Sequence, residues 1–392
     1  MDPRRNPFTP GAGSQPPELA GRDELIERIA IYIDRIAMGR QARSVILYGV
    51  RGVGKTVLLG KVRAEAESRG TFSVRIEAPE DRSLPALLAG PLRATLLRLD
   101  RMESAKSGAK RALRALASFA KIKVAYQDVE VGIDLSPEPG LADSGDLELD
   151  LTDLLAAVGE AAKERGTAVV IYMDEIQYIR EEELAAFISA MHATAQANLP
   201  VTMVGAGLPQ LLAQMGRAKS YSERLFEFHE VSRLNPGAAA NAITLPIERE
   251  GEEIEPEAVR AIVEATQGYP YYIQEFAKHA WDLAFCSPIN LQDVANATVT
   301  AVAELDASFF RVRFDRLTPT EKRYMRAMAG LGPGPHRSGD IAEVLGKQVT
   351  QLAPIRNSLI RKGMLYSPAH GDTAFTVPMF DEFMKRIMPE AG

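Results

Sequence analysis

The sequence has 392 residues, 46% of them hydrophobic and 25% charged, which is typical of a globular protein of two or three domains. A single cysteine excludes an intramolecular disulfide and a cysteine-based metal cluster, and this fits a reducing cytoplasm. The net charge of −6 argues against a chain that is coated in nucleic acid. The five histidines are scattered and show no H-x-x-x-H spacing of the kind that binds metals.

Charge and hydropathy vary along the chain. From residue 316 onward there are 11 Lys and Arg against 7 Asp and Glu, so this segment carries +4 and the remainder −10. No apolar run reaches the ~18 residues that a membrane span needs, and the first residues lack the apolar stretch of a signal peptide. We therefore expect a cytoplasmic protein without a membrane partner.

The chain is expected to begin with a disordered tail over residues 1–18, because residues 1–17 contain five prolines and few apolar anchors. Apolar side chains then recur at helical spacing, which predicts an amphipathic helix as far as Met38. Gly21 and Arg22 stand directly before this helix, and two acids follow them. Acids in a first turn are also what an ordinary helix start shows.

Residues 44–48 form an apolar run that leads into a G-x-x-x-x-G-K-T sequence, and a helical pattern follows over 55–69. This strand, loop and helix order is the context that a phosphate-binding loop requires. Backbone N–H groups of such a loop point into one concavity at a helix N-terminus. Lys55 is expected to reach the phosphates and Thr56 to bind Mg²⁺. The predicted nucleotide contacts are Gly49, Val50, Arg51, Gly52, Val53, Gly54, Lys55, Thr56 and Val57.

A strand at 72–77 and a Leu-rich helix at 83–99 are predicted next, followed by a basic helix at 103–120. Residues 121–124 and 129–135 alternate with period two, as the strands of a hairpin do. We interpret about 103–146 as an insertion into the core. It is either without a role of its own or a contact site for a neighbouring subunit or nucleic acid.

A second buried strand, at 168–173, follows a predicted helix over 151–165 and ends in Asp174 and Glu175. With a phosphate loop upstream, the first acid is expected to hold Mg²⁺ through water and the second to polarise the attacking water. The predicted cofactors are therefore ATP and Mg²⁺. A further strand at 200–207 ends in small residues, and Arg224 stands just before a fifth strand.

From residue 236 the pattern is helical, with predicted helices at 236–245, 256–266, 270–286 and 290–305. Pro270 follows a glycine and a tyrosine between two of these helices, where proline also commonly opens a helix.

The last segment predicts a winged helix. A capping box at 318–321 opens one helix, two more follow at 338–346 and about 350–362, and two short strands complete the pattern. If this domain binds double-stranded DNA, the predicted contacts are Lys347, Gln348, Thr350, Gln351, Arg356, Asn357 and His370. The alternative is a module that binds a protein partner.

The order of these features resembles the P-loop ATPases of the AAA+ and STAND kind, including origin-recognition-type and archaeal ATPase domains. The resemblance spans about residues 19–388. It implies an α/β fold with an AAA+-like five-stranded parallel sheet at 19–234, a helical lid at 235–310 and a winged helix at 316–388.

The resemblance also implies individual roles. Gly21, Arg22 and Pro270 match segments that lie near the adenine, and Arg224 matches the arginine finger that acts on a neighbouring subunit's nucleotide. The alternative for Arg224 is an ordinary surface arginine. The strand at 200–207 lacks the polar residue that touches the γ-phosphate in AAA+ proteins, so either the backbone or Gln210 does that work or hydrolysis is slow.

The sequence therefore predicts an ATP-binding and ATP-hydrolysing switch that couples its nucleotide state to a DNA-binding winged helix. The alternative is a regulatory protein that holds ATP with little or no hydrolysis and whose last domain binds a protein.

Overall fold

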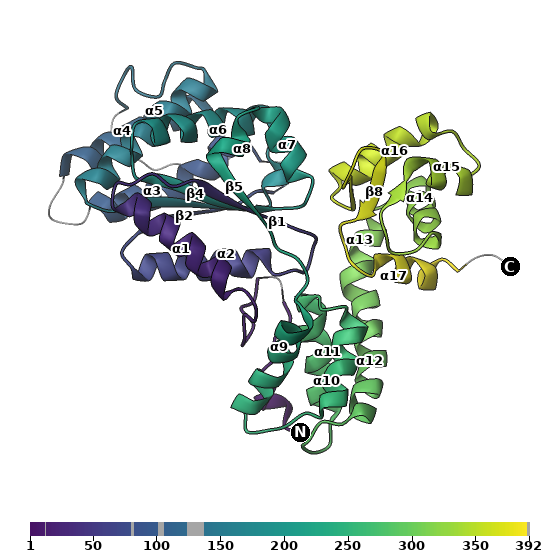
Figure 1. Cartoon of the computed structure of the whole chain (residues 1–392). Coiled ribbons are helices and arrows are strands. Elements are labelled where there is room, and N and C mark those ends of the chain that lie inside the picture. The colour runs from purple at the N-terminus through teal and green to yellow at the C-terminus, as the bar shows by residue number, and fades with distance from the viewer. Residues whose placement is uncertain (12, 80–81, 101–105, 124–136, 390–392) are drawn as a thin grey trace.

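The computed structural model describes residues 1–11, 13–79, 82–100, 106–123 and 137–389 (Figure 1). The chain forms a core built on a parallel sheet, a helical domain below it, and a C-terminal domain of short helices and strands beside the core. Among the residues described, no helix is both long and apolar enough to cross a membrane.

The central sheet has five parallel strands in the order β2-β3-β4-β1-β5. The strands are β1 (Ser44–Tyr48), β2 (Phe72–Glu77), β3 (Val169–Asp174), β4 (Val201–Gly207) and β5 (Phe226–Glu230). This confirms the predicted α/β fold. Because all the strands run the same way, the loops after β1 and β3 meet at one edge of the sheet, with β4 between them.

Helices cover both faces of the sheet (Figure 1). On one face lie α1 (Asp23–Ala37) and α2 (Lys55–Ser68), and on the other α3 (Leu84–Asp100), α4 (Lys106–Lys123), α5 (Leu147–Glu164) and α6 (Glu181–Gln196). Two shorter helices, α7 (Leu211–Ala218) and α8 (Ser222–Leu225), precede β5. Strand residues alternate between the two layers: Val45 and Leu47 pack with α1 and α2, and Ile46 packs with the opposite layer.

The predicted basic helix is α4, and it is part of the core layer. Ala112, Leu116 and Phe119 are completely buried, and the helix packs between α3 and α5. Residues 121–123, predicted as the start of a strand, are instead the last turn of this helix. The second predicted strand, at 129–135, lies outside the described residues. The apolar stripe of α4 explains why it packs into this layer, because a helix exposed on the surface on all sides would not need an apolar stripe.

The helical domain consists of α9 (Pro236–Arg249), α10 (Pro256–Thr266), α11 (Pro270–Leu283) and α12 (Leu291–Leu305). The N-terminal segment, which we predicted to be disordered, packs against it. Phe8 is 3% exposed within the hydrophobic core of this domain. Trp281 Nε1 donates to the carbonyl oxygen of Asp2 over 2.9 Å, and Asn6 Nδ2 donates to Asp282 Oδ1 over 2.7 Å. One buried aromatic side chain and these hydrogen bonds hold the segment, and its prolines reduce the conformational entropy lost on ordering it.

The C-terminal domain contains α14 (Pro319–Gly330), β6 (His336–Arg337), α15 (Ser338–Val344), α16 (Val349–Arg361), β7 (Leu365–Tyr366), β8 (Asp372–Phe375) and α17 (Phe380–Ile387). Its strands form an antiparallel sheet in the order β6-β8-β7. The predicted capping box is present, since Glu321 Oε2 accepts from the N–H of Thr318 and Thr318 Oγ1 accepts from the N–H of Glu321. Strand β6 and helix α17 were not predicted.

The helical and C-terminal domains share one continuous hydrophobic core. They are connected through η3 (Asp306–Phe310) and α13 (Arg311–Asp315). Aromatic rings run through the junction: Tyr271 stacks on Phe309 at 4.8 Å, Phe309 meets Phe310 at 5.3 Å, and Phe310 stacks on Phe383 at 5.2 Å. Ring contacts therefore connect α11 to α17.

Candidate nucleotide-binding site

The phosphate loop lies between the carboxyl end of β1 and the start of α2. Gly52 and Gly54 have φ angles of 80° and 90°, in the left-handed region that favours glycine. A Cβ at Gly49 would stand 2.1 Å from the carbonyl oxygen of Val231, so a larger residue does not fit there. The loop borders a cavity of about 460 Å³ that also touches the helical domain and the N-terminal segment.

Lys55 lies under the loop. Its ammonium group donates to the carbonyl oxygens of Gly49 at 2.9 Å and Val50 at 2.8 Å. Burial lowers the pKa of Lys55 to about 8, although the carboxylates of Glu175 and Asp174 oppose the shift. The lysine is thus a buried cation held at the phosphate loop, which is where a polyphosphate requires one.

Thr56 and Asp174, the residues predicted to bind Mg²⁺, are in contact. Thr56 Oγ1 donates to Asp174 Oδ2 over 2.6 Å, and Asp174 Oδ1 accepts from the N–H of Glu175 at 2.8 Å. Burial raises the pKa of Asp174, and the hydrogen bond from Thr56 opposes that rise. Hydroxyl and carboxylate oxygens are the ligands that Mg²⁺ prefers, so this pair fits the predicted ion.

Glu175 lines the same cavity. Its φ of 54° is unusual for a residue with a side chain, and such backbone conformations concentrate at functional sites. Its carboxylate accepts a hydrogen bond from Gln177 Nε2 and lies 3.7 Å from Arg51 Nη1. Both contacts fix the orientation of an acid that the sequence assigns to water activation.

At the end of β4, the side chain of Gln177 fills the space that a polar residue on the strand would need. Gln177 Oε1 accepts from the N–H of Leu208 at 2.9 Å, and a Cβ at Gly207 would stand 2.8 Å from the same oxygen. The amide of Gln177 therefore occupies the space beside β4. No strand-based pattern could have located it, because the residue comes from the segment after β3.

The predicted adenine contacts lie where the core meets the helical domain. Arg22 and Pro270 line the cavity, and the Arg22 guanidinium donates to the carbonyl oxygen of Ser232. Gly21 has a φ of 69°, and a Cβ there would stand 2.8 Å from the Cβ of Ala238. Gly21 thus permits the close approach that brings Arg22 to the cavity, while its own atoms do not line it.

Several cavity residues were not singled out from the sequence. Arg313 of α13 lines the cavity and lies 4.0 Å from the centre of the Phe309 ring. Burial lowers the pKa of Arg313 to about 10, and the nearby Arg51 guanidinium adds to the shift. The other cavity residues of this kind are Thr9, Pro10, Ser14, Arg75, Tyr271 and Gln274. The basic side chains among the lining residues suit an anionic ligand.

The phosphate loop contacts both of the other domains. The N–H of Arg51 donates to the carbonyl oxygen of Thr376 at 2.8 Å, and the N–H of Tyr271 donates to the carbonyl oxygen of Gly52 at 3.1 Å. The Arg51 guanidinium also donates to the hydroxyl of Tyr178 at 2.8 Å, beside the turn at Gly363. Core, helical domain and C-terminal domain thus meet at two adjacent loop residues.

Comparison with known proteins agrees with this geometry. A family model described as an AAA ATPase domain matches residues 18–204. The chain contains an AAA ATPase domain. A second model, described as a domain of unknown function (DUF8462), matches residues 307–384. The first match confirms the predicted AAA+ P-loop fold and the predicted ATPase class. No curated protein matches the chain.

Solved structures similar to this chain include the Walker-type ATPase PABY2304 of Pyrococcus abyssi. It has a TM-score of 0.60 at 15% identity, covering 95% of this chain and 97% of that one. The Aeropyrum pernix ORC1 protein in complex with DNA gives a TM-score of 0.44 at 15% identity over 95% and 94%. The Thermotoga maritima RuvB Holliday junction branch migration motor gives 0.45 at 16% identity over 97% and 100%. Of these three, the Pyrococcus abyssi protein alone has a TM-score above 0.5, and at 15% identity this likeness shows the fold and nothing further.

Arg224 lies at the opposite edge of the AAA ATPase domain from the phosphate loop. Its side chain is exposed in α8, beside a cavity of about 550 Å³ that the amino ends of β1, β4 and β5 line. It does not line the nucleotide cavity of its own chain. A role as an arginine finger therefore requires a second subunit and stays a prediction.

The DNA-contact candidates separate into groups. Lys347, Gln348, Thr350, Gln351 and His370 are exposed, the first four around the start of α16 and the last between β7 and β8. Arg356 is different, because its guanidinium donates to Thr373 Oγ1 at 2.7 Å, Ser367 Oγ at 2.8 Å and the carbonyl oxygen of Asp372 at 2.9 Å. Arg356 thus holds the β7–β8 hairpin against α16. Its guanidinium is used within its own domain, whereas the predicted role would place it against DNA.

Asn357 faces the AAA ATPase domain. Together with Arg361 it lines a groove of about 1070 Å³ between α16 and the core, whose other wall includes Gln210 and Arg233. The second half of α16 is therefore directed toward the core in this structure, while its first turn faces away.

Proposed function

We propose that this protein is an ATP-driven switch in which nucleotide bound by the AAA ATPase domain controls the position of the C-terminal domain. The observation that carries the proposal is the hydrogen bond from the N–H of Arg51 to the carbonyl oxygen of Thr376. Backbone N–H groups of a phosphate loop are the donors for bound phosphate. The C-terminal domain and a nucleotide therefore compete for the same part of the loop.

The side chain of Arg51 supports the same competition. It bridges Tyr178 and Glu175, and its guanidinium packs at the Gly363 turn of the C-terminal domain. These side-chain contacts hold the C-terminal domain against the loop while no nucleotide is bound. In the proposed switch, ATP draws Arg51 away and releases the contacts to Gly363 and Thr376.

The helical domain supplies a second route between the nucleotide and the C-terminal domain. Tyr271 and Phe309 line the nucleotide cavity and stack on each other, and Phe309 continues through Phe310 to Phe383 of α17. Nucleotide that repositions Tyr271 thereby shifts rings that belong to the C-terminal core.

The proposed hydrolysis uses groups already in place. Lys55 and Arg313 neutralise phosphate charge, and Glu175, oriented by Gln177, polarises the attacking water. Thr56 and Asp174 would hold Mg²⁺, which supplies additional positive charge at the phosphates.

Replacement of the acid tests this assignment. Glu175→Gln is expected to bind ATP normally and to lower the hydrolysis rate by about 10²- to 10⁴-fold, because the amide cannot accept a proton. Glu181→Gln, an exposed acid on α6 that pairs with Arg217, is the matched control and should hydrolyse like the wild type. Retained hydrolysis in Glu175→Gln would overturn the catalytic assignment.

The switch itself is tested with ATP trapped on Glu175→Gln. Amide hydrogen exchange in residues 363–378 should increase when ATP is added, because the segment is no longer held against the phosphate loop and opens more often. Unchanged exchange in that segment with ATP bound would contradict the switch without affecting the hydrolysis assignment.

We further propose that the C-terminal domain is a winged helix that binds double-stranded DNA through the exposed start of α16. The support is the +4 charge of the segment from residue 316 onward and the exposure of Lys347 and Gln348. Binding to a DNA duplex should weaken as salt rises, with a smaller salt dependence in Lys347→Ala than in the control Lys385→Ala on α17. No binding at low salt would remove this role.

A protein partner is the second candidate for this domain. It is favoured by the groove in which Asn357 and Arg361 already face the core of the same chain. In that case α16 serves intramolecular docking in one nucleotide state and a partner protein in the other.

A further inference from the structure

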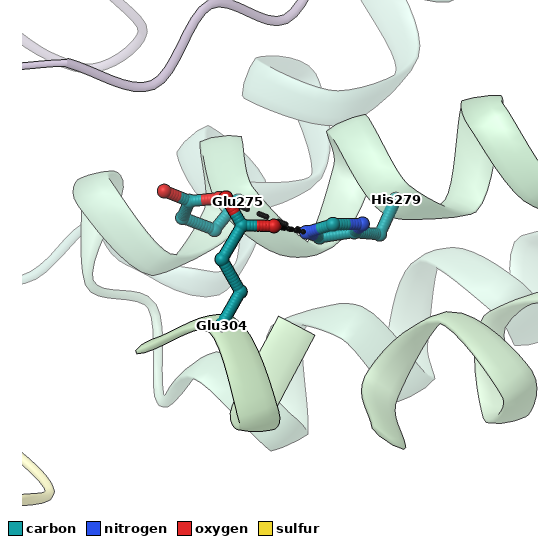
Figure 2. A group of neighbouring side chains, drawn as sticks. All are labelled: Glu275, His279 and Glu304. Atoms are coloured by element: carbon teal, nitrogen blue, oxygen red, sulfur yellow. Dashed lines mark ion pairs between the residues drawn. The ribbon is translucent and has the colours of Figure 1, made fainter. Parts of the chain in front are cut away.

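Three ionisable side chains of the helical domain point toward one another (Figure 2), and none of them lines the nucleotide cavity. Glu275 and His279 are one helical turn apart on the same face of α11, and Glu304 reaches them from the end of α12. His279 Nε2 lies 2.9 Å from Glu304 Oε2 and 3.9 Å from Glu275 Oε2. One ligand atom from each residue lies within 4.8 Å of the others.

Two of these atoms are buried without a hydrogen-bond partner. Glu275 Oε2 accepts no hydrogen bond, and His279 Nε2 makes none of good geometry, although it lies within ion-pair distance of Glu304 Oε2; both side chains are only 9% exposed. A buried polar atom without a partner costs about 1–3 kcal/mol and needs an explanation. Here both unpartnered atoms are aimed into the same small space.

The surrounding charges do not complete the cluster. Burial raises the pKa of Glu275, with Lys278 opposing the rise and Glu304 adding to it. Lys278 Nζ lies 3.9 Å from Glu304 Oε1, on the oxygen that faces away from His279. Tyr271 donates to Glu275 Oε1 at 3.2 Å, which leaves Oε2 as the free oxygen of that carboxylate.

We propose that Glu275, His279 and Glu304 bind a divalent transition-metal ion such as Zn²⁺. Two carboxylate oxygens and one imidazole nitrogen are a ligand set that such ions accept, at bond lengths of about 2.0–2.2 Å. Ligand atoms at those bond lengths lie about 3–4 Å apart, and the two distances at His279 Nε2 already match. The ion supplies the missing partner to Glu275 Oε2 and a ligand bond to His279 Nε2, and it balances the two carboxylates.

The site has the further features that a metal centre needs. Tyr271 orients Glu275 from outside the ligand set, as second-shell partners do. Glu304 is 48% exposed and provides an entry path from solvent. The bound ion would join α11, whose first turn lines the nucleotide cavity, to the helix that leads into η3 and the C-terminal domain.

The sequence gives little sign of this site. Glu275 and His279 form an E-x-x-x-H pair, which differs from the H-x-x-x-H spacing typical of metal sites, and Glu304 is remote from them in sequence. Only the packing of α12 on α11 brings the third ligand into place.

To test the proposal, the full-length protein is first stripped of metal with a chelator. It is then titrated with Zn²⁺ in a buffer that contains excess Mg²⁺ and no nucleotide. We expect one Zn²⁺ per chain in the wild type. The Cys286→Ser variant should bind equally, which shows that the exposed thiol is not a ligand. Co²⁺ in place of Zn²⁺ gives an absorption spectrum that reports the ligand set.

Glu304→Gln is the decisive variant, because its half-exposed side chain can change without disturbing the core. Loss of even an outer-shell partner costs about 10- to 100-fold in metal affinity, so loss of this ligand should cost at least that much. Glu257→Gln, an exposed glutamate on α10, is the matched control and should bind like the wild type. His279→Gln should abolish the Co²⁺ spectrum while circular dichroism shows the fold intact.

Two results would overturn the proposal: no binding of Zn²⁺ by the wild type, or equal affinity in the wild type and Glu304→Gln. The nucleotide assignment is independent of both, because Glu175→Gln and its control do not alter these residues.

Discussion

The two ends of the phosphate loop have different surroundings. At the helix end, the side chains of Lys55 and Thr56 donate hydrogen bonds to groups of the core, namely loop carbonyls and the carboxylate of Asp174. In the middle of the loop, Arg51 and Gly52 contact Thr376 of the C-terminal domain and Tyr271 of the helical domain. We call Lys55 and Thr56, which bind the phosphates and Mg²⁺ in the proposed function, the chemical end of the loop. We call Arg51 and Gly52, which contact the other domains, its conformational part.

This difference indicates how one nucleotide can be both substrate and signal. At the chemical end, Lys55 and Asp174 are buried and Thr56 donates a short hydrogen bond to Asp174, so we expect this end to change little when nucleotide binds. The conformational part is held by single hydrogen bonds to two other domains, each worth only about 0.5–1.5 kcal/mol. Changes at the first should alter ATP affinity, and changes at the second should alter the coupling between domains.

The largest effect is expected at Lys55. Lys55→Ala removes a charged donor to the phosphates and should weaken ATP binding by about 2–3 kcal/mol, which is about 30- to 150-fold in Kd. A fluorescent ATP analogue measures this directly. Lys61→Ala, on the same helix and paired with Glu65, should bind like the wild type. If both variants bind alike, the chemical end is wrongly assigned.

The pH dependence of ATP binding should follow the same residue. Burial lowers the pKa of Lys55 to about 8 in the protein, and the phosphates require the protonated form. Affinity should therefore be nearly constant below about pH 8 and fall as pH rises above it, approaching about tenfold per pH unit. Lys55→Arg keeps its charge and should show no such fall, so a fall in that variant would assign the titration elsewhere.

The chemical end was predictable from sequence because its signals are local. A strand pattern, a glycine-rich loop and a helix identify Lys55 and Thr56, and a buried strand with terminal acids identifies Asp174. Parallel strand order then brings the two segments together, as the 2.6 Å contact confirms. Such contacts need only secondary structure and one rule of topology.

The conformational part was not predictable, since its contacts depend on how whole domains pack. Arg51 belongs to the predicted loop, but nothing in the sequence connects it to Thr376. Tyr271 and Phe309 look like ordinary core aromatics, and Arg313 follows them without a motif. The packing of the N-terminal segment was missed for the same reason, because one phenylalanine, Phe8, anchors it.

Helix α17 was missed although its signal was present. Phe380, Phe383, Met384 and Ile387 recur at helical spacing, and the first three are buried. Strand β6 has only two residues, too few for a periodic pattern, and forms because His336 and Arg337 pair with β8.

A smaller effect is expected at Arg51, in the opposite direction from Lys55. If Arg51 holds the C-terminal domain against the loop, Arg51→Ala should raise exchange in residues 363–378 without nucleotide. ATP binding should then tighten by a few-fold, about 1 kcal/mol, because less of the protein is in the closed state. Arg63→Ala, in α2 and paired with Glu67, is the control. Weaker ATP binding in Arg51→Ala would show that the guanidinium acts mainly on the phosphates.

The smallest and most selective change is Tyr178→Phe. It removes the hydroxyl that Arg51 Nη2 contacts at 2.8 Å, from a residue that does not itself line the nucleotide cavity. ATP binding should tighten by no more than in Arg51→Ala, and the double variant should match Arg51→Ala alone, since both act through one contact. Tyr32→Phe removes a comparable hydroxyl bond to Glu227 on the far side of the core and should have no effect. Additive effects of Arg51→Ala and Tyr178→Phe would separate the two residues and remove the hydroxyl contact from the proposed switch.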